Sequence, residues 1–100
     1  MIGLVTATPM LREIDELYAL DWDAFGEAEW ERLGATYELL PGALSDHPGR
    51  WFSARDDEKH LSVSVEPPGL QVYGLCDAAT FEAWHTAFES LTETLPRRAV

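Results

Sequence analysis

Few residues of this sequence have the types and the spacing that catalysis requires. Ser45, Asp46 and His47 are the residue types of a hydrolase triad. Three consecutive residues, however, cannot place a nucleophile, a base and an orienting acid along one line of hydrogen bonds. The segment continues as Pro48-Gly49, a composition typical of a turn, and no Gly-x-Ser-x-Gly motif accompanies it. We therefore predict a loop here, not a catalytic centre.

The histidines and the single cysteine lack the spacing of a metal site. His47, His60 and His85 are not paired at i and i+4, and no Cys-x-x-Cys pair occurs. Cys76 precedes a predicted helix, whose dipole would lower a thiol pKa, but its apolar surroundings favour a buried, unreactive thiol. We predict no metal, no cofactor and no catalytic residue, and we do not expect an enzyme.

Acidic residues give the strongest signal. The chain has 18 Asp and Glu against 7 Lys and Arg, a net charge of −11. Nine of these acids and one base, Arg32, lie between Glu13 and Glu38, so that segment has a net charge of −8. Such a field repels phosphate backbones and anionic lipid and attracts basic proteins. We predict a basic protein partner and neither direct nucleic-acid nor membrane binding; the alternative is that the charge only maintains solubility.

The first third of the chain has helical periodicity. Thr8-Pro9 has the residues of a helix start. Apolar residues follow at helical spacing: Met10, Leu11, Ile14, Leu17 and Tyr18. A second helix is predicted from Asp21 or Asp23 to about Leu33, with Gly34 as the residue just after its C-terminal end. Its apolar positions are Trp22, Phe25, Trp30 and Leu33. The two helices are expected to form an antiparallel pair.

Four strands and a last helix are predicted after this pair. The strands are a short one at Thr36–Leu40, then Trp51–Arg55, Leu61–Val65 and Leu70–Leu75. Pro67-Pro68-Gly69 suits a type II turn with Pro68 and Gly69 at its centre. Asp77 is expected to cap the last helix, which Pro96 would end before a frayed basic tail. Its apolar stripe is Phe81, Trp84, Phe88, Leu91 and Leu95.

These elements predict one domain, residues 1–100, of the α+β class. The expected order is α-α-β-β-β-β-α, with an antiparallel meander of three to four strands packed by the C-terminal helix and accompanied by the N-terminal helical pair. One cysteine permits no intramolecular disulfide, which favours a reducing compartment. The apolar run at Met1–Thr6 is too short for a signal peptide and no membrane span is visible. We therefore expect a cytoplasmic protein.

Two surfaces are candidates for binding. The first is the acidic side of the helical pair: Glu13, Asp15, Glu16, Asp23, Glu27, Glu29 and Glu31. The second is the sheet face opposite the core, where Ser62, Ser64, Gln71 and Tyr73 would lie with Trp51 or Phe52 beside them. The alternative for the second surface is that the N-terminal helices cover it and Tyr73 is part of the core.

Small size, acidity and the lack of a catalytic motif favour a protein-binding module. We expect it to neutralise or inhibit a basic protein partner, as bacterial immunity proteins and enzyme inhibitors do. A second hypothesis is a self-associating structural or regulatory module, functioning as a homodimer. A third is a mimic of DNA, and a less favoured fourth is a small enzyme whose site is not recognised.

Overall fold

The computed structural model describes residues 10–99. The helix start predicted at Thr8-Pro9 and the apolar run at Met1–Thr6 lie outside these residues. The elements are β1 (Arg12–Tyr18), the 3-10 turn η1 (Trp22–Ala24), α1 (Glu27–Leu39), β2 (Arg50–Trp51), β3 (His60–Glu66), β4 (Gly69–Cys76) and α2 (Ala78–Leu91). The protein is thus α+β, as predicted, but a strand and one helix replace the N-terminal helical pair.

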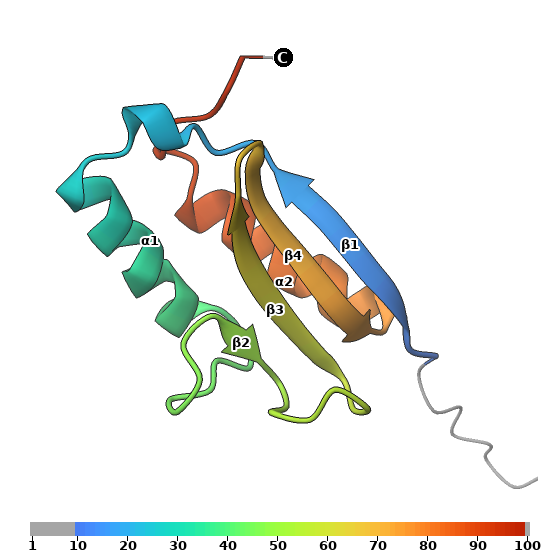
Figure 1. Cartoon of the computed structure of the whole chain (residues 1–100). Coiled ribbons are helices and arrows are strands. Elements are labelled where there is room, and N and C mark those ends of the chain that lie inside the picture. The colour runs from blue at the N-terminus through green and yellow to red at the C-terminus, as the bar shows by residue number, and fades with distance from the viewer. Residues whose placement is uncertain (1–9, 100) are drawn as a thin grey trace, which may run out of the picture.

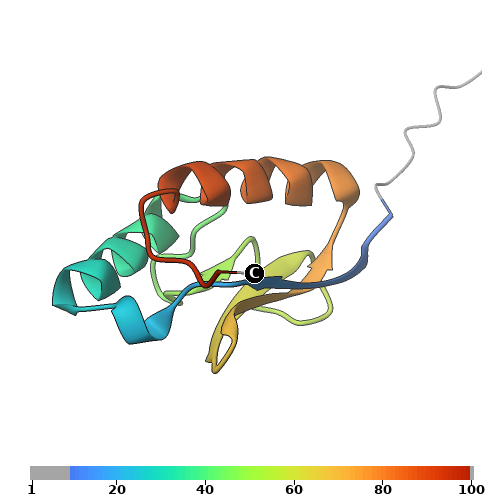
Figure 2. The same ribbon diagram turned by 90° about the horizontal axis from the view of Figure 1, so that it is seen from above.

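The four strands form one antiparallel sheet in the order β1-β4-β3-β2 (Figure 1). β4 is central, and β1 and the short β2 are the edges. Seen from above, α1 and α2 lie on the same side of this sheet, and α2 runs across its face (Figure 2). α2 therefore forms a second layer over one sheet face, and α1 lies beside it, past the β2 edge (Figure 1). No helix within residues 10–99 is both long and apolar enough to cross a membrane.

Residues 12–18 form the edge strand β1, so the prediction of a helix here is wrong. Ile14 and Tyr18 both face the core. Residues four apart share a face in a helix and also in a strand, so this spacing fits both. A helix of about nine residues is only marginally stable by itself. As a strand, the segment pairs with β4 at every residue, from Arg12 opposite Cys76 to Tyr18 opposite Leu70. Pairing thereby satisfies the backbone of the central strand.

Helix α1 begins later and ends later than predicted. Gly26, expected inside the helix, is its N-cap, and its backbone N–H donates to the Glu29 carboxylate at 2.7 Å. Gly34, expected to end the helix, lies within it at a cost of about 1 kcal/mol relative to alanine. The strand predicted at Thr36–Leu40 is instead the last turn. There the buried Thr36 hydroxyl donates to the Arg32 carbonyl at 2.9 Å.

The β3–β4 hairpin confirms the strands predicted at Leu61–Val65 and Leu70–Leu75. Its turn differs, because Glu66 pairs with Gly69 and the central residues are therefore Pro67 and Pro68. Gly69 has a φ of 149°, and a Cβ there would run into the backbone carbonyl of Tyr18 on β1. Glycine is thus required where the edge strand passes the hairpin.

Strand β2 has two residues, Arg50–Trp51, where a strand from Trp51 to Arg55 was predicted. Phe52 has a positive φ of 74°, which is uncommon for a residue with a side chain and ends the extended conformation. The Ser53 N–H then donates to the Trp51 carbonyl at 3.0 Å. A tight turn therefore interrupts the strand.

Helix α2 supplies the centre of the core, as predicted. The Asp77 side chain caps it by accepting from the Thr80 N–H at 3.0 Å. Trp84 stacks on Phe88 with a centroid distance of 5.2 Å and meets the edge of Trp51 at 5.0 Å. The fully buried side chains beneath it on the sheet are Leu61, Leu70 and Val72. Leu95 is also buried, but Leu91 remains 36% exposed, because α2 ends there, before Pro96.

The chain after α2 returns to the end of β1. Asp21 N–H donates to the Pro96 carbonyl at 2.9 Å, and Arg98 N–H donates to the Ala19 carbonyl at 2.8 Å. Leu20 and Arg97 form an antiparallel bridge. The described part of the predicted frayed tail is therefore held by backbone hydrogen bonds.

Candidate functional site

One face of the sheet is not covered by any helix within residues 10–99 (Figure 2), although Ser62 on it is only 8% exposed. We call it the open face. Strand register places three rows of side chains on it: Leu17, Gln71 and Ser64; Asp15, Tyr73 and Ser62; Glu13, Leu75 and His60. Leu17 is 50% and Tyr73 42% exposed. Ser62, Ser64, Gln71 and Tyr73 thus share the face opposite the core, and the described helices do not cover it.

Trp51 does not belong to the open face. Its side chain is fully buried, and its indole N–H donates to the Tyr37 carbonyl at 3.0 Å. Its neighbours are the rings of Tyr37 and Trp84, both met edge-on. Residues alternate between the two faces of a strand, and Trp51 lies opposite Leu61, a core residue. Trp51 thus connects β2 to both helices. The prediction that it binds a partner is wrong, because its side chain is fully buried.

The β1 edge brings two of the predicted acids beside Tyr73. Asp15 lies opposite Tyr73, and Glu13 lies opposite Leu75. The Asp15 carboxylate accepts from the Gln71 side-chain amide at 2.8 Å. We call Glu13 and Asp15 the β1 margin of the open face. Glu16 is separate from them, because it projects from the opposite side of β1.

Glu16 lies near Tyr18 on the helix side of the sheet. Burial raises the Tyr18 pKa above its ordinary value, and the charge of Glu16 raises it further. The Tyr18 hydroxyl lies 2.7 Å from His85 Nδ1 on α2. Glu16 therefore belongs to the surroundings of the core, not to the open face.

The remaining predicted acids lie in η1 and α1, together with an aromatic cluster. Trp22 and Trp30 stack with a centroid distance of 5.0 Å, and Phe25 meets both rings edge-on. The Trp22 indole N–H donates to the Glu66 carbonyl at 2.6 Å, which ties the cluster to the end of β3. Trp30 is 43% exposed. The cluster thus combines a packed support with an exposed aromatic surface.

Two acids of this region have local roles. Glu29 accepts from the Gly26 N–H at the start of α1, and Asp21 accepts from the Asp23 N–H at 3.2 Å. Carboxylates at such positions stabilise helix starts. We call Asp23, Glu27 and Glu31 the α1 margin, since all three are exposed. Glu29 is then better understood as a structural residue than as a binding residue.

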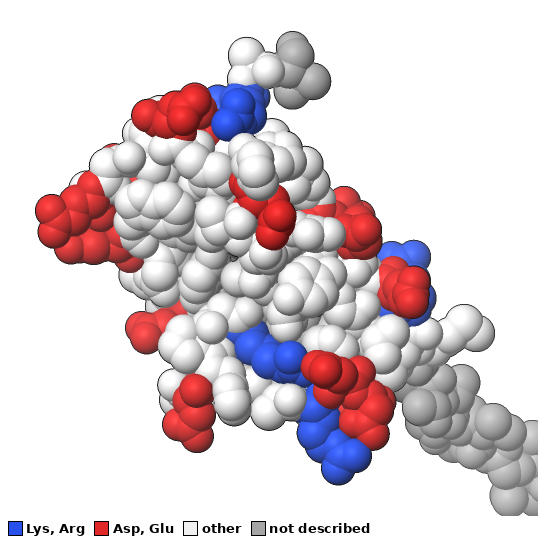
Figure 3. All heavy atoms as spheres, viewed as in Figure 1, with Lys and Arg blue, Asp and Glu red and all other residues white. Residues whose placement is uncertain are grey.

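The acids therefore form two margins and not the single surface expected from a helical pair. β1 is one edge of the sheet, and α1 lies beyond the opposite edge (Figure 1). Figure 3 shows acidic groups at both sides of this face and a mostly uncharged surface between them, in which a few charged groups also lie. The register places Arg50, opposite Ser62, and Glu66, opposite Gly69, on the open face. This division could not be read from the sequence, because it depends on residues 12–18 being a strand.

Sequence reasoning missed the hollow within the open face. Glu13, Asp15, Tyr73, Leu75 and His60 line a wide, shallow depression. His60 is 7% exposed and lies on β3. Its Nδ1 lies 2.8 Å from the Glu58 carbonyl, which only accepts, so Nδ1 carries a proton there. Strict alternation along β3 was the signal that placed His60 on the same face as Ser62.

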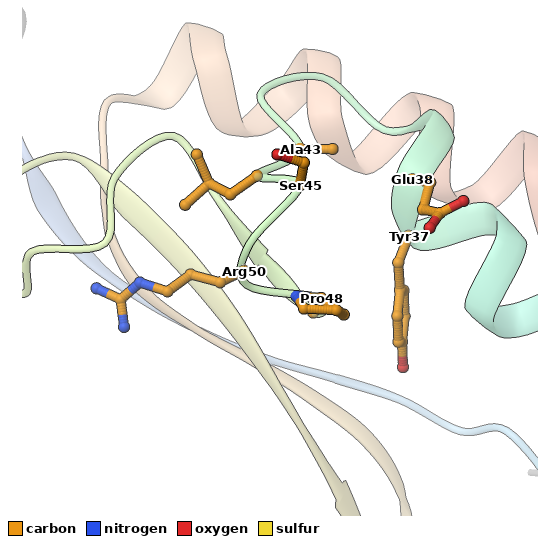
Figure 4. A pocket seen from close by; sticks show the side chains of 8 residues that line it. Tyr37, Glu38, Ala43, Ser45, Pro48 and Arg50 are labelled. Atoms are coloured by element: carbon orange, nitrogen blue, oxygen red, sulfur yellow. The ribbon is translucent and has the colours of Figure 1, made fainter.

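A narrower pocket of about 220 Å³ lies between the end of α1 and the loop before β2 (Figure 4). Tyr37 and Pro48 face each other across it, and Ser45 contributes to its wall. Burial raises the Tyr37 pKa to about 12. The Arg50 guanidinium points away from Tyr37 and pairs with Asp56 at 2.7 Å. Asp46 and His47 are exposed in the adjoining turn. We assign no acid–base pair to this pocket.

Cys76 is fully buried at the end of β4, as expected. Burial raises its thiol pKa, and the neighbouring charge of Asp77 raises it further, so the thiolate is disfavoured. Asp77 itself pairs with Lys59 at 2.7 Å, and this pair holds the Asp77 carboxyl pKa well below its usual range. Within residues 10–99 no group of three His, Cys, Asp or Glu is arranged to hold a metal ion.

No protein-family model, curated protein or solved structure matches this chain. The functional argument therefore depends on the open face and its two margins.

Proposed function

We propose that this chain is a small acidic protein-binding module, which neutralises or inhibits a basic protein partner in the cytoplasm. One observation carries the proposal: the open face displays the exposed side chains of Leu17 and Tyr73, and acidic margins lie on both sides of it. Protein interfaces have this composition, with an aromatic and apolar centre and a polar rim.

The two parts of this surface have different tasks. The margins attract a cationic partner over roughly 10 Å at physiological ionic strength and so increase its association rate. The centre contributes affinity, because Leu17 and Tyr73 lose contact with water when a partner covers them. Tyrosine is suited to this position, since it buries a large ring and keeps a hydroxyl for hydrogen bonding.

A cytoplasmic location agrees with the one cysteine, Cys76. Its thiol is free and buried at the strand end, as expected of a cysteine that forms no disulfide. A basic target in the same compartment would then be held inactive by direct contact.

The proposal is tested by capturing the partner from native lysate and measuring its association kinetics by stopped flow. We expect the association rate to fall at least tenfold between low and physiological salt. The double variant Glu27→Gln/Glu31→Gln should lower the rate in low salt, and Glu13→Gln/Asp15→Asn should do the same. Glu29 is left intact in both variants, because it caps α1.

A matched control removes two charges elsewhere. Glu82 and Glu93 are exposed in and after α2, the helix that covers the other face of the sheet. Glu82→Gln/Glu93→Gln changes the net charge equally and should leave the association rate nearly unchanged. An association rate that does not depend on salt would contradict the proposal, and equal effects of all three variants would show that only net charge matters.

A further inference from the structure

The outer edge of β1 offers hydrogen-bonding groups that no described residue uses. β1 is seven residues long, and among residues 10–99 it pairs with β4 alone, so no described strand lies beside Arg12–Tyr18 on the other side. The opposite edge is different, because β2 has two residues and is followed by a turn. Long unprotected edges are rare in proteins, since they accept further strands. The β1 edge is the one suited to strand addition.

The register identifies which residues of β1 point outward. Glu66 and Gly69 flank the two-residue turn of the hairpin and form a hydrogen-bonded pair. Every second residue of β4 from Gly69 onward, Tyr73 included, therefore directs its backbone N–H and C=O groups to β3. The remaining residues of β4 bond toward β1, where their partners are Arg12, Ile14, Glu16 and Tyr18. The backbone N–H and C=O groups of Glu13, Asp15 and Leu17 are then directed away from the sheet.

The side chains on this edge favour one kind of strand. Glu13 and Asp15 project onto the open face beside the exposed Leu17, and Glu16 projects on the other side. β1 contains three acids and one base, Arg12. In a second copy paired about a two-fold axis, carboxylates would lie opposite or next to carboxylates, which destabilises the pair. A strand with alternate basic side chains would instead place opposite charges across from one another.

We propose that β1 accepts an extended segment of the basic partner as a fifth strand, with lysine or arginine opposite Glu13 and Asp15 and an apolar residue near Leu17. This inference rests on the proposed function and specifies how the partner is held. Backbone hydrogen bonds to Glu13, Asp15 and Leu17 contribute affinity, and the carboxylates select a basic sequence. The added strand extends the open face beyond the β1 margin.

Hydrogen exchange of single amides tests the proposal with the full chain. The probe is a synthetic nine-residue peptide of alternating lysine and threonine, used up to millimolar concentration. We expect exchange at Glu13, Asp15 and Leu17 to slow at least tenfold, while Ile14 and Glu16, already bonded to β4, change little. The same peptide with glutamate in place of lysine should have no effect. No slowing with the lysine peptide, or equal slowing with both peptides, would overturn the proposal.

Two variants of one residue separate the edge from the charge. Leu17→Pro removes an outward N–H without removing a bond to β4, as edge positions permit, and retains all three carboxylates. Leu17→Thr removes the apolar side chain and retains the N–H. We expect Leu17→Pro to weaken peptide binding at least tenfold more than Leu17→Thr does. Protected amides at Glu16 and Tyr18 would show that the proline variant remains folded.

The natural partner distinguishes this proposal from the proposed function. If the partner associates in a salt-dependent manner while the Glu13, Asp15 and Leu17 amides exchange as before, the strand proposal fails and the proposed function stands. If association does not depend on salt, the proposed function fails. If the free protein is a dimer by light scattering and its outward β1 amides are already protected, the occupant of the edge is a second copy and the strand proposal is overturned.

Discussion

The two faces of the sheet differ in what their side chains contact. The covered face meets Trp51, Trp84 and Phe88, all fully buried. On the open face, Leu17 and Tyr73 keep about half of their surface in water. Because burial of apolar surface is the main favourable term in folding, the covered face accounts for most of the stability. The open face can therefore change with little effect on the fold, and the two faces should respond differently to mutation.

The largest effect is expected at the centre of the covered face. Trp84→Ala should lower the free energy of unfolding by about 3–5 kcal/mol, because it removes a large buried ring and leaves a cavity. Denaturant unfolding measures the change. Trp30→Ala is the matched control: it removes the same side chain where it is 43% exposed, so its cost should be clearly smaller. Equal costs for the two variants would show that Trp84 contributes no more to the core than the partly exposed Trp30 does.

The sequence predicted the covered face better than the rest. The α2 stripe and the alternation in Leu61–Val65 each fit only one kind of element, and both are confirmed. Residues 12–18 fit a helix and a strand equally, and pairing with β4 decided between them. Likewise, Gly26 was expected inside a helix and Gly34 just after it. The hydrogen bond from the Gly26 N–H to Glu29 instead starts α1 at Glu27, and the helix continues past Gly34.

For the candidate site, the sequence predicted residues but not their grouping. Tyr73 and Ser62 were placed correctly on the face opposite the core, because alternation requires it. Trp51 was misplaced, because the face that it occupies depends on its pairing with Leu61, which the local sequence does not show. The separation of Glu13 and Asp15 from the α1 margin depends on sheet order, a property of long-range pairing that local patterns do not contain.

The second prediction uses pH to examine a tyrosine on the covered side. Burial against Trp51 raises the Tyr37 pKa to about 12. In the unfolded chain the pKa is near 10, so between about pH 10 and 12 the unfolded state has lost this proton and the folded state has kept it. Stability should therefore be constant below about pH 10 and fall above it. The full contribution of Tyr37 is roughly 2–3 kcal/mol.

Tyr37→Phe should flatten this alkaline fall, which chemical unfolding at several pH values would detect. Tyr73→Phe is the control, because Tyr73 is on the open face. Tyr18, which is also buried and has a raised pKa, should maintain part of the fall in the Tyr37 variant. If stability depends on pH in the Tyr37→Phe variant as it does in the unmodified chain, the Tyr37 hydroxyl is hydrated and is not buried against Trp51.

The smallest effect on stability is expected at Tyr73, the exposed aromatic residue of the open face. Tyr73→Ala should change the free energy of unfolding by about 1 kcal/mol at most, because the ring is 42% exposed and lies on the sheet face opposite the core. Binding of the captured partner should nevertheless weaken at least tenfold, which is about 1.4 kcal/mol. Tyr73→Phe keeps the ring and should retain most of the affinity. Calorimetric titration of both variants measures this difference.

Unfolding by Tyr73→Ala would mean that the open face contributes to stability as the covered face does. Unchanged affinity with an intact fold would instead locate the binding centre away from Tyr73, and the contrast between the two faces would then no longer correspond to a contrast between folding and binding.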